Sequence, residues 1–114
     1  MTTRHRDRNV IFDVVDNVLT RQVVFPDGNS YTHRCTLESF KDVAHAIEER
    51  AEEGVTCDGL AEALDLPHTQ VNVALEFMKE RGCVEMRRRR TYPASNVLFE
   101  DAMIEFTFLA ELPY

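Results

Sequence analysis

The chain has 114 residues, 44% of them hydrophobic, and a formal net charge of −7. This length and apolar content suit one domain with its own core, so we expect residues 1–114 to form a single domain. No run reaches the roughly eighteen apolar residues of a membrane span, and no signal-peptide pattern is present. Three widely spaced cysteines argue against a disulfide framework. These features predict a cytoplasmic protein that does not contact a membrane.

The first eight residues are polar and include Arg4, Arg6 and Arg8. They lack apolar anchors, so we expect a flexible tail over residues 1–8. Two interpretations stay open, an ordinary charged terminus and an arm that enters a nucleic-acid groove.

Residues 9–20 are rich in valine, and their apolar side chains recur at helical spacing. The pattern predicts an N-terminal helix with a wide apolar face, which needs a covering partner. Residues 22–25 and 30–34 then flank Pro26-Asp27-Gly28-Asn29, a combination typical of a tight turn, and predict a β-hairpin or ordered loop. Asp27 and His33 could suggest a catalytic or metal pair, but no other chemical group converges on them, so we interpret them as polar turn and surface residues.

Thr36 is suited to cap the next helix, which we expect to run to about Glu53 and to end at Gly54. Its C-terminal part carries four glutamates, Glu48, Glu49, Glu52 and Glu53. We interpret them as a solvated face, with a divalent-cation site as the alternative.

Residues 55–91 predict a short helix, a tight turn, a second helix and a strand. Thr56 can cap the first helix, and the Leu66-Pro67 turn breaks it. The second helix is expected from Pro67 to about Arg81, where Gly82 supplies a stop with positive φ. The strand that follows, Cys83-Val84-Glu85-Met86, runs into four arginines, Arg87–Arg90.

This stretch resembles the winged helix-turn-helix core of small bacterial regulators. The resemblance rests on Leu60-Ala61-Glu62-Ala63-Leu64, the Leu66-Pro67 turn, Val71 with Ala74-Leu75, and Glu80-Arg81-Gly82-Cys83-Val84-Glu85. It covers about a third of the chain and implies a mainly α, α+β winged-helix fold over residues 36–92, with a small β wing.

Residues 96–112 carry a wide apolar face opposite Glu100, Asp101, Glu105 and Glu111, which predicts a C-terminal helix. Two apolar terminal helices around a winged helix resemble the dimer scaffolds of arsenic-repressor-like and multiple-antibiotic-resistance-like regulators. We therefore expect a homodimer through the terminal helices. The paired thiols of the arsenic-repressor-like sensors have no counterpart here, so no metal site is predicted.

In a DNA-binding protein of this type, the second helix enters the major groove. The residues expected to contact DNA are His68, Thr69, Gln70 and Asn72. Gln70 and Asn72 can pair with adenine, whereas His68 and Thr69 can hold phosphates. Ordinary polar surface is the alternative interpretation.

Two features of the sequence favour different functions, protein contact and nucleic-acid binding. Val73 and Phe77 are expected to form an outward apolar pair, which indicates a partner protein or a covering element. By contrast, Arg87, Arg88, Arg89 and Arg90 concentrate four positive charges on a wing, where they can bind phosphates. The alternative for the run is neutralisation of acidic helices in the same chain.

No glycine-rich phosphate loop, nucleophile motif or metal-spaced His/Cys pair occurs, so we expect no enzyme activity and no cofactor. The sequence predicts a regulator that binds double-stranded DNA through residues 67–81 and the arginine-rich wing. The alternatives are a winged-helix protein-interaction module that uses Val73 and Phe77, and nonspecific nucleic-acid contact by wing and tail alone.

Overall fold

Two β-strands occupy the N-terminal stretch for which a helix was predicted. The computed structural model describes residues 9–112, so the predicted tail over residues 1–8 lies outside the described residues. Strands β1 (Asn9–Val15) and β2 (Val18–Val24) pair antiparallel around Asp16 and Asn17, which have φ of 53° and 63°. Asp and Asn tolerate these left-handed values, which a type I′ hairpin turn requires. The predicted N-terminal helix is therefore wrong.

Strand β3 (Ser30–Thr36) completes an antiparallel meander in the order β1-β2-β3. The predicted hairpin around residues 26–29 is confirmed as the β2–β3 connection, in which the Phe25 N–H donates to the Asn29 carbonyl at 2.8 Å. Alternation along the strands turns Phe12, Val14, Leu19 and Cys35 inward, whereas Ile11 and Val15 remain exposed on the other face.

Helix α1 (Leu37–Glu49) follows the sheet directly. The Thr36 hydroxyl accepts from the Ser39 N–H at 3.2 Å, which confirms the predicted cap. The helix ends four residues earlier than the predicted Glu53, with the Arg50 N–H capping it. The helix dipole makes negative charge unfavourable at a helix C-terminus. A helix that ran to Glu53 would place Glu52 and Glu53 in its last turn, which disfavours this extension.

Helices α2 (Cys57–Leu64) and α3 (His68–Glu80) match their predicted positions, with Thr56 accepting from the Gly59 N–H at 3.0 Å. Strands β4 (Val84–Arg87) and β5 (Arg90–Pro93) form a two-stranded antiparallel hairpin. Val55 adds an isolated bridge to Thr91 through N–H···O bonds of 2.9 and 2.8 Å. Helix α4 (Leu98–Ala110) lies within the predicted residues 96–112.

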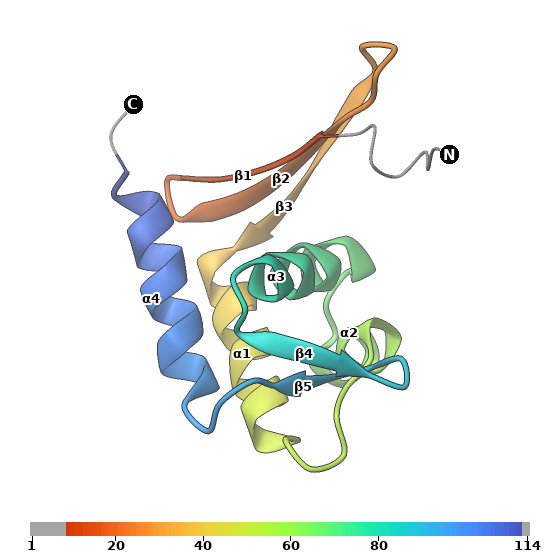
Figure 1. Cartoon of the computed structure of the whole chain (residues 1–114), viewed down its shortest axis with the longest axis vertical. Helices are drawn as coiled ribbons and strands as arrows, with labels where there is room; N and C mark the ends of the chain where they lie inside the picture. Colours follow the sequence, from red (N-terminus) through yellow and green to blue (C-terminus); the bar gives the residue numbers. More distant parts are fainter. Residues whose placement is uncertain (1–8, 113–114) are drawn as a thin grey trace.

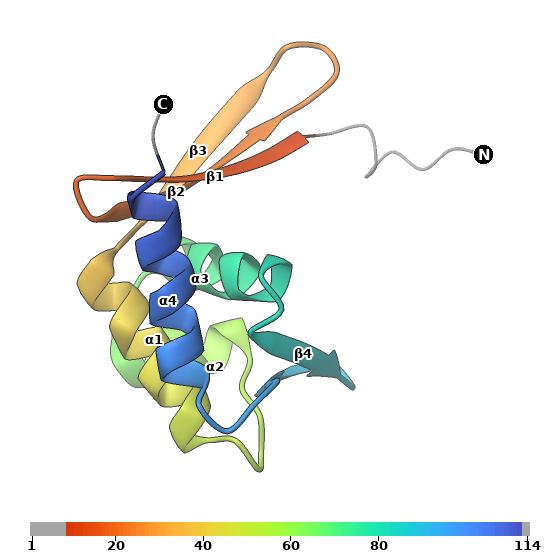
Figure 2. The same cartoon turned by 60° about the vertical axis from the view of Figure 1, so that its left-hand side comes forward.

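Residues 9–112 thus form an α+β fold with four helices and two small antiparallel sheets. The β1–β3 sheet lies across one end of the helices, and the β4–β5 hairpin lies below α3 and projects sideways from the body (Figure 1). Helix α4 runs alongside α1 and reaches β1 (Figure 2). Phe40 joins these layers, because its ring lies 5.9 Å from that of Phe77 on α3 and 5.1 Å from that of Phe106 on α4.

None of the helices in residues 9–112 has the length and apolar character to cross a membrane.

Candidate nucleic-acid interface

The tip of the β4–β5 hairpin consists of two arginines in an unusual backbone conformation. Arg87 pairs with Arg90, which leaves Arg88 and Arg89 as a two-residue turn with φ of 50° and 70°. Such turns favour Asn, Asp and Gly, and the Asp16-Asn17 turn of the same chain follows this preference. A side chain in the left-handed region costs roughly 1–2 kcal/mol when it is neither Gly, Asn nor Asp. Backbone strain of this kind is characteristic of functional sites.

The other two arginines are engaged within the chain. The Arg87 guanidinium lies 3.9 Å from the centroid of the Tyr92 ring, and one of its nitrogens is 3.8 Å from a Glu85 carboxylate oxygen. Arg90 donates to the carbonyls of Glu53 and Gly54 at 2.8 and 2.9 Å. Arg90 therefore anchors the hairpin to the loop after α1.

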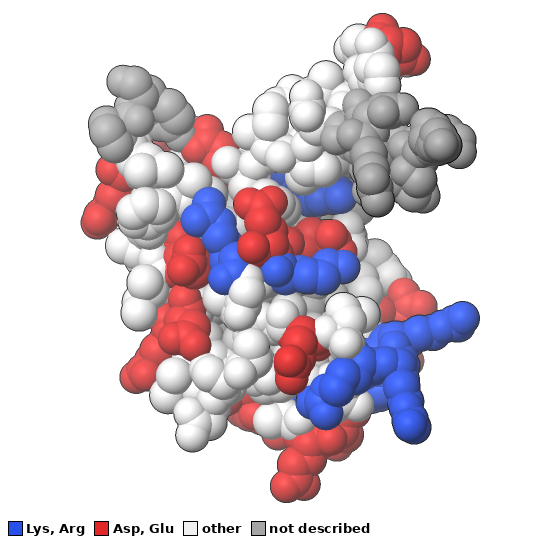
Figure 3. Space-filling model, in the orientation of Figure 1, with Lys and Arg blue, Asp and Glu red and all other residues white. Residues whose placement is uncertain are grey.

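Arg88 and Arg89 make no hydrogen bond or ion pair with any residue of the described range 9–112. Both are exposed, and the basic atoms of the hairpin project from the body as one group (Figure 3). The interpretation that the run neutralises acidic helices therefore does not hold for these two residues. Their guanidinium groups are free to bind an external anion.

The structure places the predicted base-reading residues at the start of α3. His68 and Thr69 are exposed, and His68 Nε2 lies 3.0 Å from an Asp58 carboxylate oxygen. Asn72 is half-buried at the edge of a groove. Gln70 is also half-buried, and its Oε1 accepts from the Thr36 N–H at 3.1 Å. This bond uses the acceptor that Gln70 would need to pair with adenine.

Val73 and Phe77 do not form an outward face. Both are fully buried, because the N-terminal sheet covers this side of α3 and the Phe12 ring meets the Phe77 ring at 5.4 Å. The predicted partner face at Val73 and Phe77 is wrong. The covering element is the sheet made by residues for which a helix was predicted.

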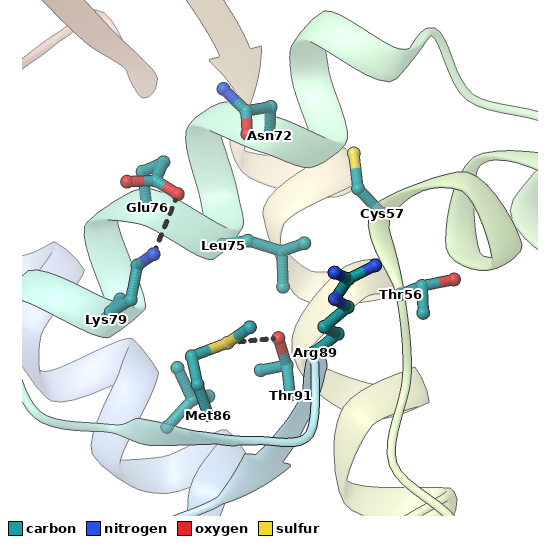
Figure 4. Close-up of a pocket in the computed structure, with 10 residues that line it drawn as sticks. Thr56, Cys57, Asn72, Leu75, Glu76, Lys79, Met86, Arg89 and Thr91 are labelled. Atoms are coloured by element: carbon teal, nitrogen blue, oxygen red, sulfur yellow. Dashed lines mark hydrogen bonds and ion pairs between the residues drawn. The ribbon is translucent and has the colours of Figure 1, made fainter.

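A groove of about 220 Å³ separates α3 from the hairpin. Its α3 wall carries Asn72 and an ion pair between Glu76 and Lys79 at 3.2 Å, and Arg89 extends toward Cys57 from the opposite side (Figure 4). Burial, followed by the charges of Asp58 and Glu76, raises the pKa of the Cys57 thiol. The thiol therefore stays protonated at neutral pH and is a poor nucleophile or metal ligand.

Tyr92 was not among the residues predicted from the sequence for this site. Glu85 is the direct cross-strand partner of Tyr92, and Arg87 is two residues further along β4. Aromatic and long side chains can contact such diagonal neighbours. A prediction of the two-residue turn would have brought Arg87 and Tyr92 together.

Within residues 9–112, no three His, Cys, Asp or Glu side chains come close enough to hold a metal ion. Comparison with family models, with curated proteins and with solved structures finds no match to this chain.

Proposed function

We propose that residues 36–93 form a winged helix-turn-helix unit and that the chain binds duplex DNA. The supporting feature is the order of elements: α1, the Val55 bridge, α2, α3, and the β4–β5 hairpin as the wing. In this arrangement α3 is the recognition helix, and the hairpin contacts the neighbouring sugar-phosphate backbone.

The observation that carries the proposal is the pair of free guanidiniums at the hairpin tip. Arg88 and Arg89 occupy a turn that would be more stable with Asn and Gly, and no described side chain neutralises them. Arginine binds phosphate in a bidentate manner, and release of counterions from DNA makes such binding salt-dependent. A chain of net charge −7 therefore concentrates its affinity for DNA at this tip.

Sequence discrimination would come from a short segment of α3. His68, Thr69 and Asn72 remain accessible, whereas Gln70 is bonded to the backbone of Thr36. Further along the helix, Glu76 repels phosphates, although its ion pair with Lys79 weakens this effect. We therefore expect modest base preference on top of strong backbone binding, as suits a transcriptional regulator.

The test is fluorescence anisotropy with a random-sequence duplex and with a pooled genomic library at low salt. Wild type should bind, and the double variant Arg88→Gln/Arg89→Gln should bind at least tenfold more weakly. A matched control, Arg34→Gln/Lys41→Gln, removes two exposed positive charges outside the hairpin and should retain most of the affinity. Absence of wild-type binding at low salt, or equal losses in the two double variants, would refute the proposal.

We also propose that α4 mediates the expected homodimer. Its outer surface leaves Ile104 and Phe108 64% and 56% exposed, and Leu112 extends the same apolar stripe. Between Leu98 and Ala110 the helix carries acidic residues and no basic one, so two copies repel each other at low salt. Dimerisation measured by sedimentation should therefore strengthen as salt rises. A monomer at all salt concentrations would contradict this assignment.

A further inference from the structure

A second hollow, of about 210 Å³, lies between the N-terminal sheet and α3. Six side chains line it, Val10, Phe12 and Arg21 from the sheet and Glu76, Lys79 and Glu80 from the helix. Figure 3 shows basic atoms beneath the sheet and atoms of both charges on the surface below them. Because a dry cavity of about 150 Å³ can hold benzene, this hollow has room for one small molecule.

Arg21 is the unusual member of this lining. It is 7% exposed, on the inner side of β2, and its Nε atom is buried without a hydrogen-bond partner. No described residue in the range 9–112 forms an ion pair with it. Only the Nε atom is fully enclosed, so the rest of the guanidinium borders the hollow, where an anionic group can pair with it. A carboxylate is the planar group that fits arginine with two parallel hydrogen bonds.

The helix wall of the hollow is mainly acidic. Glu76 is paired with Lys79, and Glu80 lies 3.8 Å from Arg81 Nε, which is a weak contact. Because Lys79 balances Glu76, the helix wall keeps one net negative charge, which disfavours a ligand that is only an anion and attracts a positive group. Val10 and Phe12 add apolar surface beside Arg21. The lining therefore matches a ligand with a negative end, a positive end and an apolar part.

We propose that this hollow is a binding site for a small zwitterion, namely an α-amino acid with an apolar side chain. The ligand carboxylate pairs with the Arg21 guanidinium. Its ammonium group lies toward Glu76 and Glu80, and its side chain packs on Val10 and Phe12. This site is separate from the hairpin tip and does not depend on DNA binding.

The test uses the full chain and three probes of similar shape: L-leucine, 4-methylpentanoate without the ammonium group, and 3-methylbutylamine without the carboxylate. Calorimetric titration should detect L-leucine, and the two partial probes should bind at least tenfold more weakly. L-leucine should also raise the Tm in a concentration-dependent manner. Arg21→Gln should abolish binding and Glu80→Gln should weaken it several-fold, whereas Arg34→Gln, on the adjacent strand, should leave it unchanged.

Two results with the wild-type protein would overturn the proposal. One is the absence of L-leucine binding to wild type up to about 10 mM, where even a weak site would be filled. The other is equal binding of L-leucine and 4-methylpentanoate, which would assign a simple anion site. Should Arg21→Gln fail to fold, Glu76→Gln/Glu80→Gln serves as the second variant, and unchanged L-leucine affinity in it would also contradict the proposal.

Discussion

The Phe12 ring on β1 meets the Phe77 ring on α3 edge to face, with 5.4 Å between centroids and 65° between planes. This contact attaches the N-terminal sheet to α3. Phe77 also packs against Phe40 and is fully buried. We predict that Phe77→Ala lowers the free energy of unfolding by about 3–5 kcal/mol, because it opens a cavity at the junction of three elements. Urea denaturation measures this change.

The matched control is Phe108→Ala, which truncates a ring that is 56% exposed on α4. It should change the free energy of unfolding by about 0.5 kcal/mol or less in the monomer. Similar small effects for both variants would mean that Phe77 is not covered by the sheet in solution.

Gly54 and Gly82 both have φ of +77°, yet their surroundings differ. A Cβ on Gly54 would lie 2.6 Å from the Tyr92 ring, whereas a Cβ on Gly82 would meet nothing within 4 Å. Both alanine variants share the backbone strain of roughly 1–2 kcal/mol. Thermal unfolding should show a clearly larger loss for Gly54→Ala, because Tyr92 must move. Equal losses in the two variants would contradict the close approach of Tyr92 to Gly54.

Substitution of the turn residues Arg88 and Arg89 by Asn and Gly is expected to raise stability, unlike the substitutions above. Arg88→Asn/Arg89→Gly should raise the free energy of unfolding by about 1 kcal/mol, because these residues adopt positive φ at lower cost. Arg88→Ala/Arg89→Ala removes the same two charges without relieving the strain, so its stability should not rise. The same gain in both variants would attribute the effect to charge and not to the backbone.

Burial raises the pKa of the Cys35 thiol from 9.0 to about 12. Because the folded state disfavours the thiolate, the contribution of Cys35 to stability is complete below about pH 9 and is lost as the pH rises toward 12. Above about pH 9, the free energy of unfolding should therefore fall more steeply for wild type than for Cys35→Ala. The slopes of the two stability curves against pH should differ by about 1.4 kcal/mol per pH unit, which is the value for the release of one proton. Parallel curves for the two proteins would contradict the burial of this thiol.

Local signals in residues 36–112 predicted the helices well. Thr36 and Thr56 accept the expected N–H bonds, and Gly82 takes positive φ after α3. These features depend on one or two neighbouring residues, which is why sequence alone identifies them.

The N-terminal segment shows where such reasoning fails. Val10, Val14 and Val18 fit a helical stripe, but the same segment also alternates as β1 and β2 around the Asp16-Asn17 turn. Valine favours strands, and only pairing with β2 and β3 decides between the two patterns. Because a helix was predicted in place of β1 and β2, the burial of Val73 and Phe77 under this sheet was not predicted. The sheet that covers α3 is distant from it in sequence. The exposure of the α3 residues could therefore not be predicted from local patterns.

The proposed phosphate contact of Arg88 and Arg89 is tested most directly by the salt dependence of DNA binding. Anisotropy titrations of a random-sequence duplex over a salt series should be made with wild type and with Arg88→Asn/Arg89→Gly, whose turn is preserved. If both guanidiniums bind phosphates, the slope of log affinity against log salt should be shallower in the variant by about 1.8, since each contact contributes about 0.9. Identical slopes and affinities in the two proteins would contradict the assignment of this hairpin as a DNA-binding wing.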